Sequence, residues 1–443
     1  MDSEKLQRLG FYLSLIVLSV FYGVAAALLG WFPTDVVVRA FDQAHRLLAP
    51  PDVVFERVHD RTGTRTYLPD RYSPGVTAVT SIWWAGDDGT PALRLLGRDG
   101  QILHSWRIDQ EVLSVVRDKR RPLGFAELYL HGSEVLPGGD VIVNLEYRGT
   151  VRLDACGRIR WYLGGGGHHS VTRSANGTFW IPGVSDKPSI ESPGHPDGLP
   201  GLDHPVYHDY LRRVSADGEV LQRIHVLDLL YRNRLERHIL KRRDPGSPDV
   251  THLNDVEALP PGMADAYPLF EANDLLVSLR NLDLVFVVDP DTEKIKWHAS
   301  HPFLQQHDPD FVGDGWIGVF DNSRDGTPRG DVLGGSRIIA LQPHTSSRKV
   351  LFPTRHSGPF FTGIGGKWQQ LDNGNLLLVE FDAGRAVEVT PDGRTVWEWI
   401  VEPYDERWLP AVADATRLEL TPREIASWPC SPGDSTDRRE TVR

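Results

Sequence analysis

Four histidines stand at matching positions along the chain, and imidazole is the side chain best suited to chemistry near neutral pH. His131, His169 and His307 each lie eight residues before a turn glycine, and His252 fits the same register with an insertion. An imidazole can act as a nucleophile, as a general acid or base, or as a metal ligand. Four of them in one register predict a shared site.

An arginine adds an anion-binding group. Arg280 lies in the apolar stretch LLVSLRNLDLVFVV, where a guanidinium needs an anionic partner from the protein or from a ligand. Its fork of N–H groups matches the oxygens of sulfate or phosphate. The alternative is a structural ion pair with Asp255 or Asp283.

These side chains must be positioned by a repeat of short strands. A hairpin with Asp, and usually Gly, at its turn recurs, for example as GRDGQILHSW, VDPDTEKIKW and VTPDGRTVWEW. Another pair of strands precedes most hairpins, so each unit has four strands. Four-stranded units repeated radially are the blades of a β-propeller. The sequence predicts an all-β, six-bladed β-propeller with blades at about 76–107, 131–161, 169–222, 252–297, 307–350 and 367–399.

The propeller architecture brings residues that are distant in sequence to one site. The innermost strand of each blade lines the central channel, and the starts of these strands lie on one rim. We therefore expect His131, His169, His252 and His307 to surround one pit, with Gly366 leaving the sixth-blade position open. The lack of βαβ periodicity excludes a parallel α/β sheet, and a β-sandwich is the remaining alternative.

Two insertions interrupt the repeat. Residues 183–211 are rich in Pro, Gly and His and are typical of a long loop. Residues 226–243 carry apolar residues at helical spacing and predict a helix just before His252. That helix either roofs the pit or packs on the blades.

The N-terminal region contains a charge-free apolar run from Phe11 to Phe32, about as long as the roughly 20 residues that a bilayer-spanning helix needs. We expect an uncleaved transmembrane anchor. The alternative is a cleaved signal peptide, with Ala25, Ala26 and Ala27 near its cleavage site. The predicted organisation is a short stub at 1–10, the anchor at 11–32, a linker and lead-in at 33–75, the propeller at 76–402, and a C-terminal extension with a disordered end at 403–443.

Charge and cysteine content narrow the partners. The formal net charge is −12 and no basic stripe is present, which argues against nucleic acid as a partner. The two cysteines, Cys156 and Cys430, lack zinc-site spacing and could form one disulfide in an oxidising compartment.

Three motifs in order resemble the core of the arylsulfate sulfotransferase family. They are THLNDVEAL at 251–259, DLLVSLRNLDLVFVVD at 274–289 and QQHDPDFVGDGWIGVFDN at 305–322. The stretch FFTGIGGKWQQLDNGNLLLVEF is similar to the closing blade of the family. The resemblance covers about residues 125–400. It implies transfer of a sulfuryl group between phenols through a sulfohistidine, by a ping-pong mechanism without a nucleotide donor.

The resemblance also implies roles for individual residues. His307 would be the nucleophile. Arg280 and His252 would hold the sulfuryl oxygens and the leaving oxygen, with Asn254 beside them.

The motif GGHHS would supply the remaining catalytic residue. His169 is favoured because it is in register, whereas His168 and His131 are expected to line the substrate pit. No metal or other cofactor is expected. The expected partners are an aryl sulfate donor and a phenolic acceptor, with the membrane contacted through the N-terminal helix.

Two features depart from the family pattern. The 40 or so residues between the anchor and the first blade are too few for the N-terminal β-sandwich domain of soluble periplasmic members, and the anchor itself is a difference. The family resemblance leads us to expect a single-pass protein with its propeller on the periplasmic or extracellular side. The oligomeric state is not indicated.

Two other functions remain alternatives. One is a metal-dependent enzyme with the four histidines around an ion, which the cationic Arg280 disfavours. The other is a non-catalytic propeller scaffold.

Overall fold

The chain forms two separate units in the computed structural model, Met1–Asp52 and Val53–Arg443. The structure describes residues 3–29, 54–85, 88–116 and 129–430. Residues 33–53 of the predicted linker and lead-in, and residues 431–443 of the predicted C-terminal extension, lie outside the described residues.

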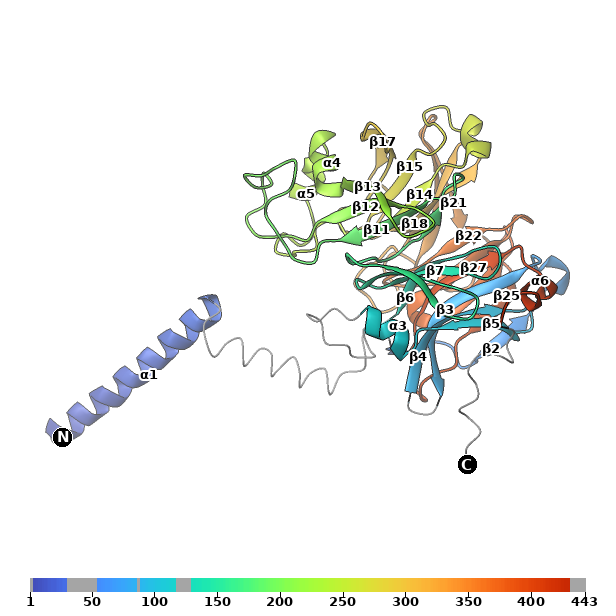
Figure 1. Cartoon of the computed structure of the whole chain (residues 1–443). Coiled ribbons are helices and arrows are strands. Elements are labelled where there is room, and N and C mark those ends of the chain that lie inside the picture. Colours follow the sequence, from blue (N-terminus) through green and yellow to red (C-terminus); the bar gives the residue numbers. More distant parts are fainter. Residues whose placement is uncertain (1–2, 30–53, 86–87, 117–128, 431–443) are drawn as a thin grey trace. The chain divides into compact units, whose positions relative to one another are not determined.

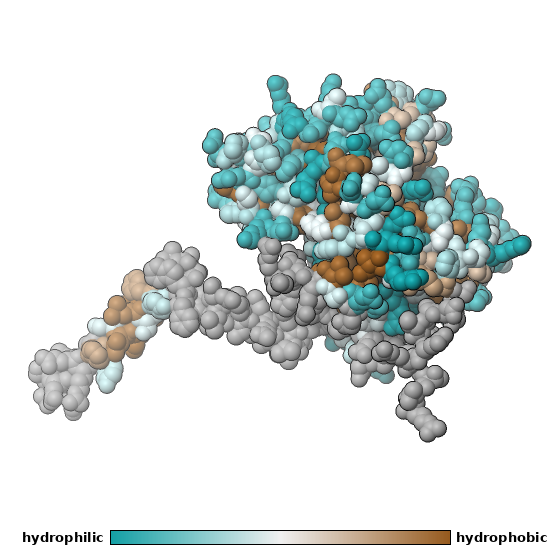
Figure 2. All heavy atoms as spheres, in the orientation of Figure 1, coloured by the Kyte–Doolittle hydropathy of each residue, from teal (hydrophilic) through white to brown (hydrophobic). Residues whose placement is uncertain are grey.

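Helix α1, Ser3–Leu29, is the described element of the first unit. Its side chains from residue 11 to residue 24 are exposed, Phe21 among them, and Figure 2 shows hydrophobic residues along the helix. Among the described residues, the structure contains no helix with both the length and the apolarity to cross a membrane. The anchor at 11–32 stays a prediction.

The described residues of the second unit form six antiparallel sheets of four or five strands, which confirms the predicted six-bladed β-propeller (Figure 1). Strands that follow one another in the chain pair within each sheet. The second to fifth blades are β6–β9 (Leu130–Val135, Val141–Leu145, Gly149–Leu153, Ile159–Leu163), β10–β13 (Thr172–Arg173, Phe179–Val184, Asp209–Val214, Val220–His225), β14–β17 (Leu253–Ala258, Leu275–Leu279, Leu284–Asp289, Lys294–Ala299) and β18–β21 (His307–Gly313, Trp316–Asp321, Arg337–Gln342, Ser347–Phe352).

The first blade is closed by the C-terminal part of the chain. Strand β27, Val412–Leu418, pairs with β3, Val76–Ala85, and β4, Asp88–Leu96, and β5, Ile102–Arg107, complete the sheet. The propeller therefore includes residues that the sequence analysis places in a C-terminal extension beyond 402. The prediction missed β27 because its partner strand lies more than 300 residues earlier.

The sixth blade has an additional outer strand. Its strands are β22 (Trp368–Gln370), β23 (Leu376–Glu380), β24 (Arg385–Val389), β25 (Thr395–Ile400) and β2 (Gly63–Thr66). A separate two-stranded sheet joins β1 (Val54–Glu56) to β26 (Trp408–Pro410). The remaining helices are α3 (Gln110–Val115), α4 (Val226–Arg232), α5 (Glu236–Leu240), α6 (Pro422–Ala426) and the 3-10 turns η1 (Pro69–Arg71), η3 (Pro261–Ala266), η4 (Arg280–Leu282) and η5 (Phe381–Ala383).

Apolar side chains between neighbouring blades form the core. Every residue of β7, β15 and β23 is buried, which is why these second strands are almost continuously apolar. A strand with packed neighbours on both faces has no solvent side that needs polar residues. The starts of the innermost strands are thereby held at fixed positions around the channel.

The insertion before the fourth blade differs from the predicted single helix at 226–243. It forms two short helices, α4 and α5, separated at Arg234, whose backbone has a φ of 59°. Leu227, Leu230 and Leu235 are buried in one cluster with residues of the third and fourth blades. The insertion therefore packs on the blades.

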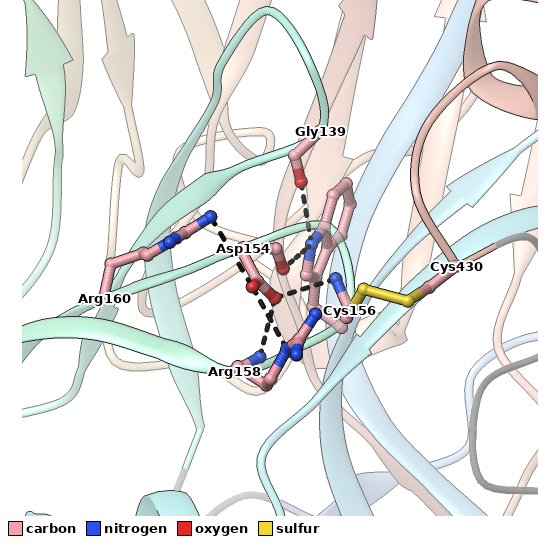
Figure 3. The surroundings of a disulfide bond; sticks show 7 residues. Gly139, Asp154, Cys156, Arg158, Arg160 and Cys430 are labelled. Atoms are coloured by element: carbon pink, nitrogen blue, oxygen red, sulfur yellow. Dashed lines mark hydrogen bonds and ion pairs between the residues drawn. A yellow bond between two sulfur atoms is a disulfide. The ribbon is translucent and has the colours of Figure 1, made fainter.

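A disulfide fixes the chain beyond the closing strand. Cys156 of the second blade and Cys430 are bonded, a pairing that the sequence analysis leaves open (Figure 3). Beside it, the indole N–H of Trp106 donates to the carbonyls of Gly139 and Asp154, each at 3.1 Å. The disulfide links the closing segment to a blade other than the one that β27 completes.

Candidate active site

The four histidines at equivalent positions of the repeat lie together at one end of the channel. His131 is on β6 and His307 begins β18, while His169 and His252 lie just before β10 and β14. The ring centroid of His169 is 4.1 Å from that of His131, 5.1 Å from that of His252 and 6.2 Å from that of His307. The structure thus brings these predicted site residues into one cluster, in which His169 and His307 are buried and His131 and His252 are partly exposed.

The tautomer of His307 is fixed by Asn322. The amide nitrogen of Asn322 donates to the carbonyls of Thr362 and Gly365, so its Oδ1 is the acceptor facing His307 Nδ1 at 2.6 Å. His307 therefore carries its proton on Nδ1 and a lone pair on Nε2. Burial, with the nearby charge of Arg280, lowers the pKa of His307 well below its usual value. A neutral imidazole with a free Nε2 is a nucleophile.

His252 is paired with a carboxylate instead. Its Nδ1 lies 2.6 Å from Asp249 Oδ2, and its backbone N–H donates to Asp249 Oδ1 at 3.1 Å. Burial alone would raise the pKa of Asp249, but the adjacent His252 more than offsets this and the pKa is lowered. A carboxylate at Nδ1 supports an imidazole that accepts and returns a proton at Nε2.

Arg280 lies directly after the second strand of the fourth blade. Its guanidinium donates to Asn281 Oδ1 at 3.2 Å and, among the described residues, has no ion pair. Asp283, one of the partners considered from sequence, binds Arg243. Burial lowers the pKa of Arg280, and nearby Arg324 acts in the same direction. A partly buried guanidinium without an ion pair is suited to an anionic ligand.

A buried carboxylate contacts His131 and His169. Glu146 Oε2 is 3.2 Å from His131 Nδ1, and its Oε1 is 3.7 Å from His169 Nδ1. Burial would raise the pKa of Glu146, but His131 and other nearby histidines outweigh it and the pKa is lowered. Burial lowers the pKa of His169 well below its usual value. One ligand atom from each of the three residues lies within 4.8 Å of the others, so they are also candidate metal ligands.

His168 lies behind His169 at the edge of the cluster. The two Nδ1 atoms are 2.9 Å apart, and His168 Nε2 is 3.6 Å from Asp209 Oδ1. The ring of Tyr147 lies 5.0 Å from that of His168. His168 is therefore placed to orient its neighbour.

Asn254 is buried with one group unused. Its amide nitrogen donates to the carbonyl of Gln306 at 2.7 Å, while its Oδ1 has no hydrogen-bond partner among the described residues. The hydrogen bond connects Asn254 to the residue that precedes His307.

Two site residues, Glu146 and Asn322, were not predicted from the sequence. Glu146 follows β7 and Asn322 follows β19, the second strands of their blades, just as the predicted Arg280 follows β15. Glu146 and Asn322 both lie 15 residues after the histidine that they contact. The same register that located the histidines would have located their partners, had the second-strand ends been aligned as well.

Beyond the histidines, the innermost strands line an acidic cavity of about 600 Å³. Its walls include Glu134, Asp255, Glu257 and Asp310, with Lys367 as a cation bonded to Asp308 at 2.9 Å. Burial raises the pKa of Asp255 to about 8, and the charge of Asp308 adds to the effect. The channel therefore has two chemically different parts, the histidine cluster and the acidic cavity.

The chain is similar at low sequence identity to several solved structures. A protein of unknown function from Bacteroides caccae is 10% identical and covers 79% of this chain and 100% of its own, with a TM-score of 0.49. A catalytically inactive virginiamycin B lyase from Staphylococcus aureus, solved with quinupristin, is 13% identical and covers 65% and 75% of the two chains, with a TM-score of 0.35. The WD40 propeller domain of Doa1 is 9% identical, covers 81% and 100%, and has a TM-score of 0.40. No curated protein matches the chain.

The family comparison is more specific. The model described as arylsulfotransferase (ASST) matches residues 132–402, which include His169, His252, Arg280 and His307 together with Glu146 and Asn322. The match spans more than half of the 443 residues. The chain belongs to the arylsulfotransferase family.

Proposed function

We propose that the protein transfers a sulfuryl group from an aryl sulfate to a phenol through a sulfohistidine at His307, without a nucleotide donor. Family membership supports sulfotransferase chemistry in general. The observation that carries the proposed mechanism is the hydrogen bond from His307 Nδ1 to Asn322, because it leaves Nε2 as the nucleophilic atom.

In the first half-reaction, His307 Nε2 attacks sulfur and forms an N–S bond while the S–O bond to the aryl group breaks. Arg280 meets the charge on the sulfuryl oxygens, as cationic clamps do in phosphoryl transfer. His252, oriented by Asp249, supplies the proton that converts the departing phenolate to a phenol.

The second half-reaction reverses these roles with a new phenol. His252 takes the proton of the acceptor, and the phenol oxygen attacks sulfur. The N–S bond breaks and its electron pair returns to Nε2 of His307. His169 and Asn254 complete the surroundings of the sulfuryl group, and His131 and His168 line the pit.

The test is turnover of a chromogenic aryl sulfate with a phenol acceptor, for wild type and His307→Ala, with no nucleotide donor. We expect wild-type turnover, a covalently sulfated His307 peptide when the acceptor is omitted, and neither in the variant. Absence of turnover in wild type across several donors would reject the proposal in favour of a scaffold or a metal-dependent enzyme.

We also propose that the apolar segment 11–32 anchors the protein in a membrane with its propeller on the periplasmic or extracellular side. The disulfide between Cys156 and Cys430 supports this location, because such bonds persist mainly in oxidising compartments. Protease added to intact spheroplasts should digest the propeller. Protection that is lost only on lysis would place it in the cytoplasm and contradict the proposal.

A further inference from the structure

The pit contains three side chains of the types that bind metal ions, and the proposed sulfuryl transfer does not need the three together. We propose that His131, Glu146 and His169 bind a divalent first-row transition-metal ion. This site goes beyond the proposed function, and its occupancy can be measured without any sulfate ester.

The geometry is close to that of a bound site. One ligand atom from each residue lies within 4.8 Å of the other two. Ligand atoms at about 2.0–2.2 Å from a shared tetrahedral zinc ion lie about 3.3–3.6 Å from one another. Small side-chain rotations therefore close the site, and Glu146 already has an oxygen 3.2 Å from His131 Nδ1.

The types of ligand select the class of ion. Two imidazoles and one carboxylate are a ligand set for zinc, iron or cobalt, and three protein ligands leave coordination positions open. Calcium and magnesium prefer oxygen ligands. We therefore expect Zn²⁺ and Co²⁺ to bind, and Mg²⁺ and Ca²⁺ not to bind.

The charges around the three residues favour a cation. The Glu146 side chain is 6% exposed and contacts imidazoles. Among the described residues it has no Lys or Arg partner in an ion pair, and Arg280 is not paired with it. A buried carboxylate gains a full countercharge from a bound ion. The pit thus offers separate groups for an anion, at Arg280, and for a cation.

The neighbouring His168 holds one of the proposed metal ligands, His169, in place. His168 Nδ1 is 2.9 Å from His169 Nδ1, and His168 Nε2 faces Asp209 Oδ1 at 3.6 Å. Hydrogen bonding at one nitrogen of a ligand imidazole orients the ring and leaves the other nitrogen for the metal. His168 constrains the ring of His169 in this manner.

The experiment measures metal uptake by the full-length protein. Chelator-treated wild type, Glu146→Gln and His252→Ala are titrated with Zn²⁺ by calorimetry and with Co²⁺ by visible absorption. His252→Ala is the matched control, because His252 shares the pit but is outside the proposed ligand group. We expect wild type and the control to bind one equivalent of ion. Glu146→Gln should bind the ion at least about 10-fold more weakly, because the loss of even a hydrogen-bonding partner of a metal ligand typically lowers affinity by about 10–100-fold.

Two results would overturn the proposal. One is the absence of saturable binding to wild type, and the other is equal affinity in wild type and Glu146→Gln. His131→Gln replaces Glu146→Gln as the test variant if the latter does not fold by circular dichroism. Since the ion itself is measured, failure of aryl sulfate turnover leaves the outcome unaffected.

Discussion

His307 and Asn322 are joined by a 2.6 Å hydrogen bond whose donor and acceptor are fixed, because Asn322 uses its own N–H groups on two backbone carbonyls. The pair sets which ring nitrogen of His307 is free. It also makes the protonation of His307 testable.

Asn322→Asp should move the acid limb of the pH–rate profile to higher pH. In wild type, burial holds the pKa of His307 well below its usual value, so the imidazole is neutral at pH 6 to 8. A carboxylate acceptor raises a neighbouring pKa by about 1–3 units. We therefore expect the pH at which kcat/KM falls on the acid side to rise by about 1–3 units relative to wild type. Asn176→Asp, in an exposed turn, is the control, and an unchanged Asn322→Asp profile would contradict the assigned tautomer.

Arg280→Gln should lower activity without lowering stability. Removing a preorganised charge stabiliser costs about 10²–10³ in kcat. No ion pair is lost within the described residues, so the melting temperature should stay the same or rise. The matched variant is Arg385→Gln, since Arg385 is buried and paired with Glu380 and Glu398. It should destabilise by about 3–5 kcal/mol. Equal destabilisation by both variants would show that Arg280 has a structural partner.

Asp255→Asn should stabilise the protein at pH 8 but not at pH 4. The folded pKa is about 8, above the value of about 3.9 for an unfolded chain. Between pH 4 and pH 8 the folded state therefore binds more protons at this site than the unfolded state does. The free energy of unfolding falls as the pH rises across this range, and the loss is complete once the pH has passed 8. Asparagine does not titrate, so we expect a gain on the order of 1 kcal/mol or more at pH 8. Urea unfolding at pH 4 and pH 8 measures this gain, with the exposed Asp291→Asn variant as control. An equal effect of Asp255→Asn on stability at the two pH values would refute the raised pKa of Asp255.

Cys156→Ser with Cys430→Ser should destabilise the propeller. Removal of a native disulfide costs about 2–5 kcal/mol, and this one spans 274 residues. We expect a lower melting temperature in the double variant and no further decrease on addition of reductant. Wild type should fall to the same value when reduced, and insensitivity of wild type to reductant would contradict a stabilising role.

The sequence predicted those features that repeat locally. The turn glycines set the register of four blades, the blade of His252 fitted it with an insertion, and this register predicted that His131, His169, His252 and His307 share one pit. Propeller blades are local meanders, so their strands can be recognised from adjacent segments.

Other features depend on contacts that no local pattern contains. Strand β27 pairs with β3 across the whole length of the propeller, and neither strand signals its partner. The helix predicted at 226–243 is interrupted because Leu235 turns into the core after Arg234 adopts a left-handed conformation. Glu146 and Asn322 were missed because a single polar residue at a strand end has many ordinary explanations.

Closure by β27 has a consequence for the order in which the molecule can be assembled during synthesis. Until residues 412–418 leave the ribosome, β3 presents an unpaired edge, and exposed edges are prone to pair with other chains. The ring cannot close, and the histidines cannot reach their final spacing, while that segment is missing. A nascent chain stalled before residue 412 would carry every proposed catalytic side chain and still be inactive, so the last blade strand to be translated determines when the site first exists.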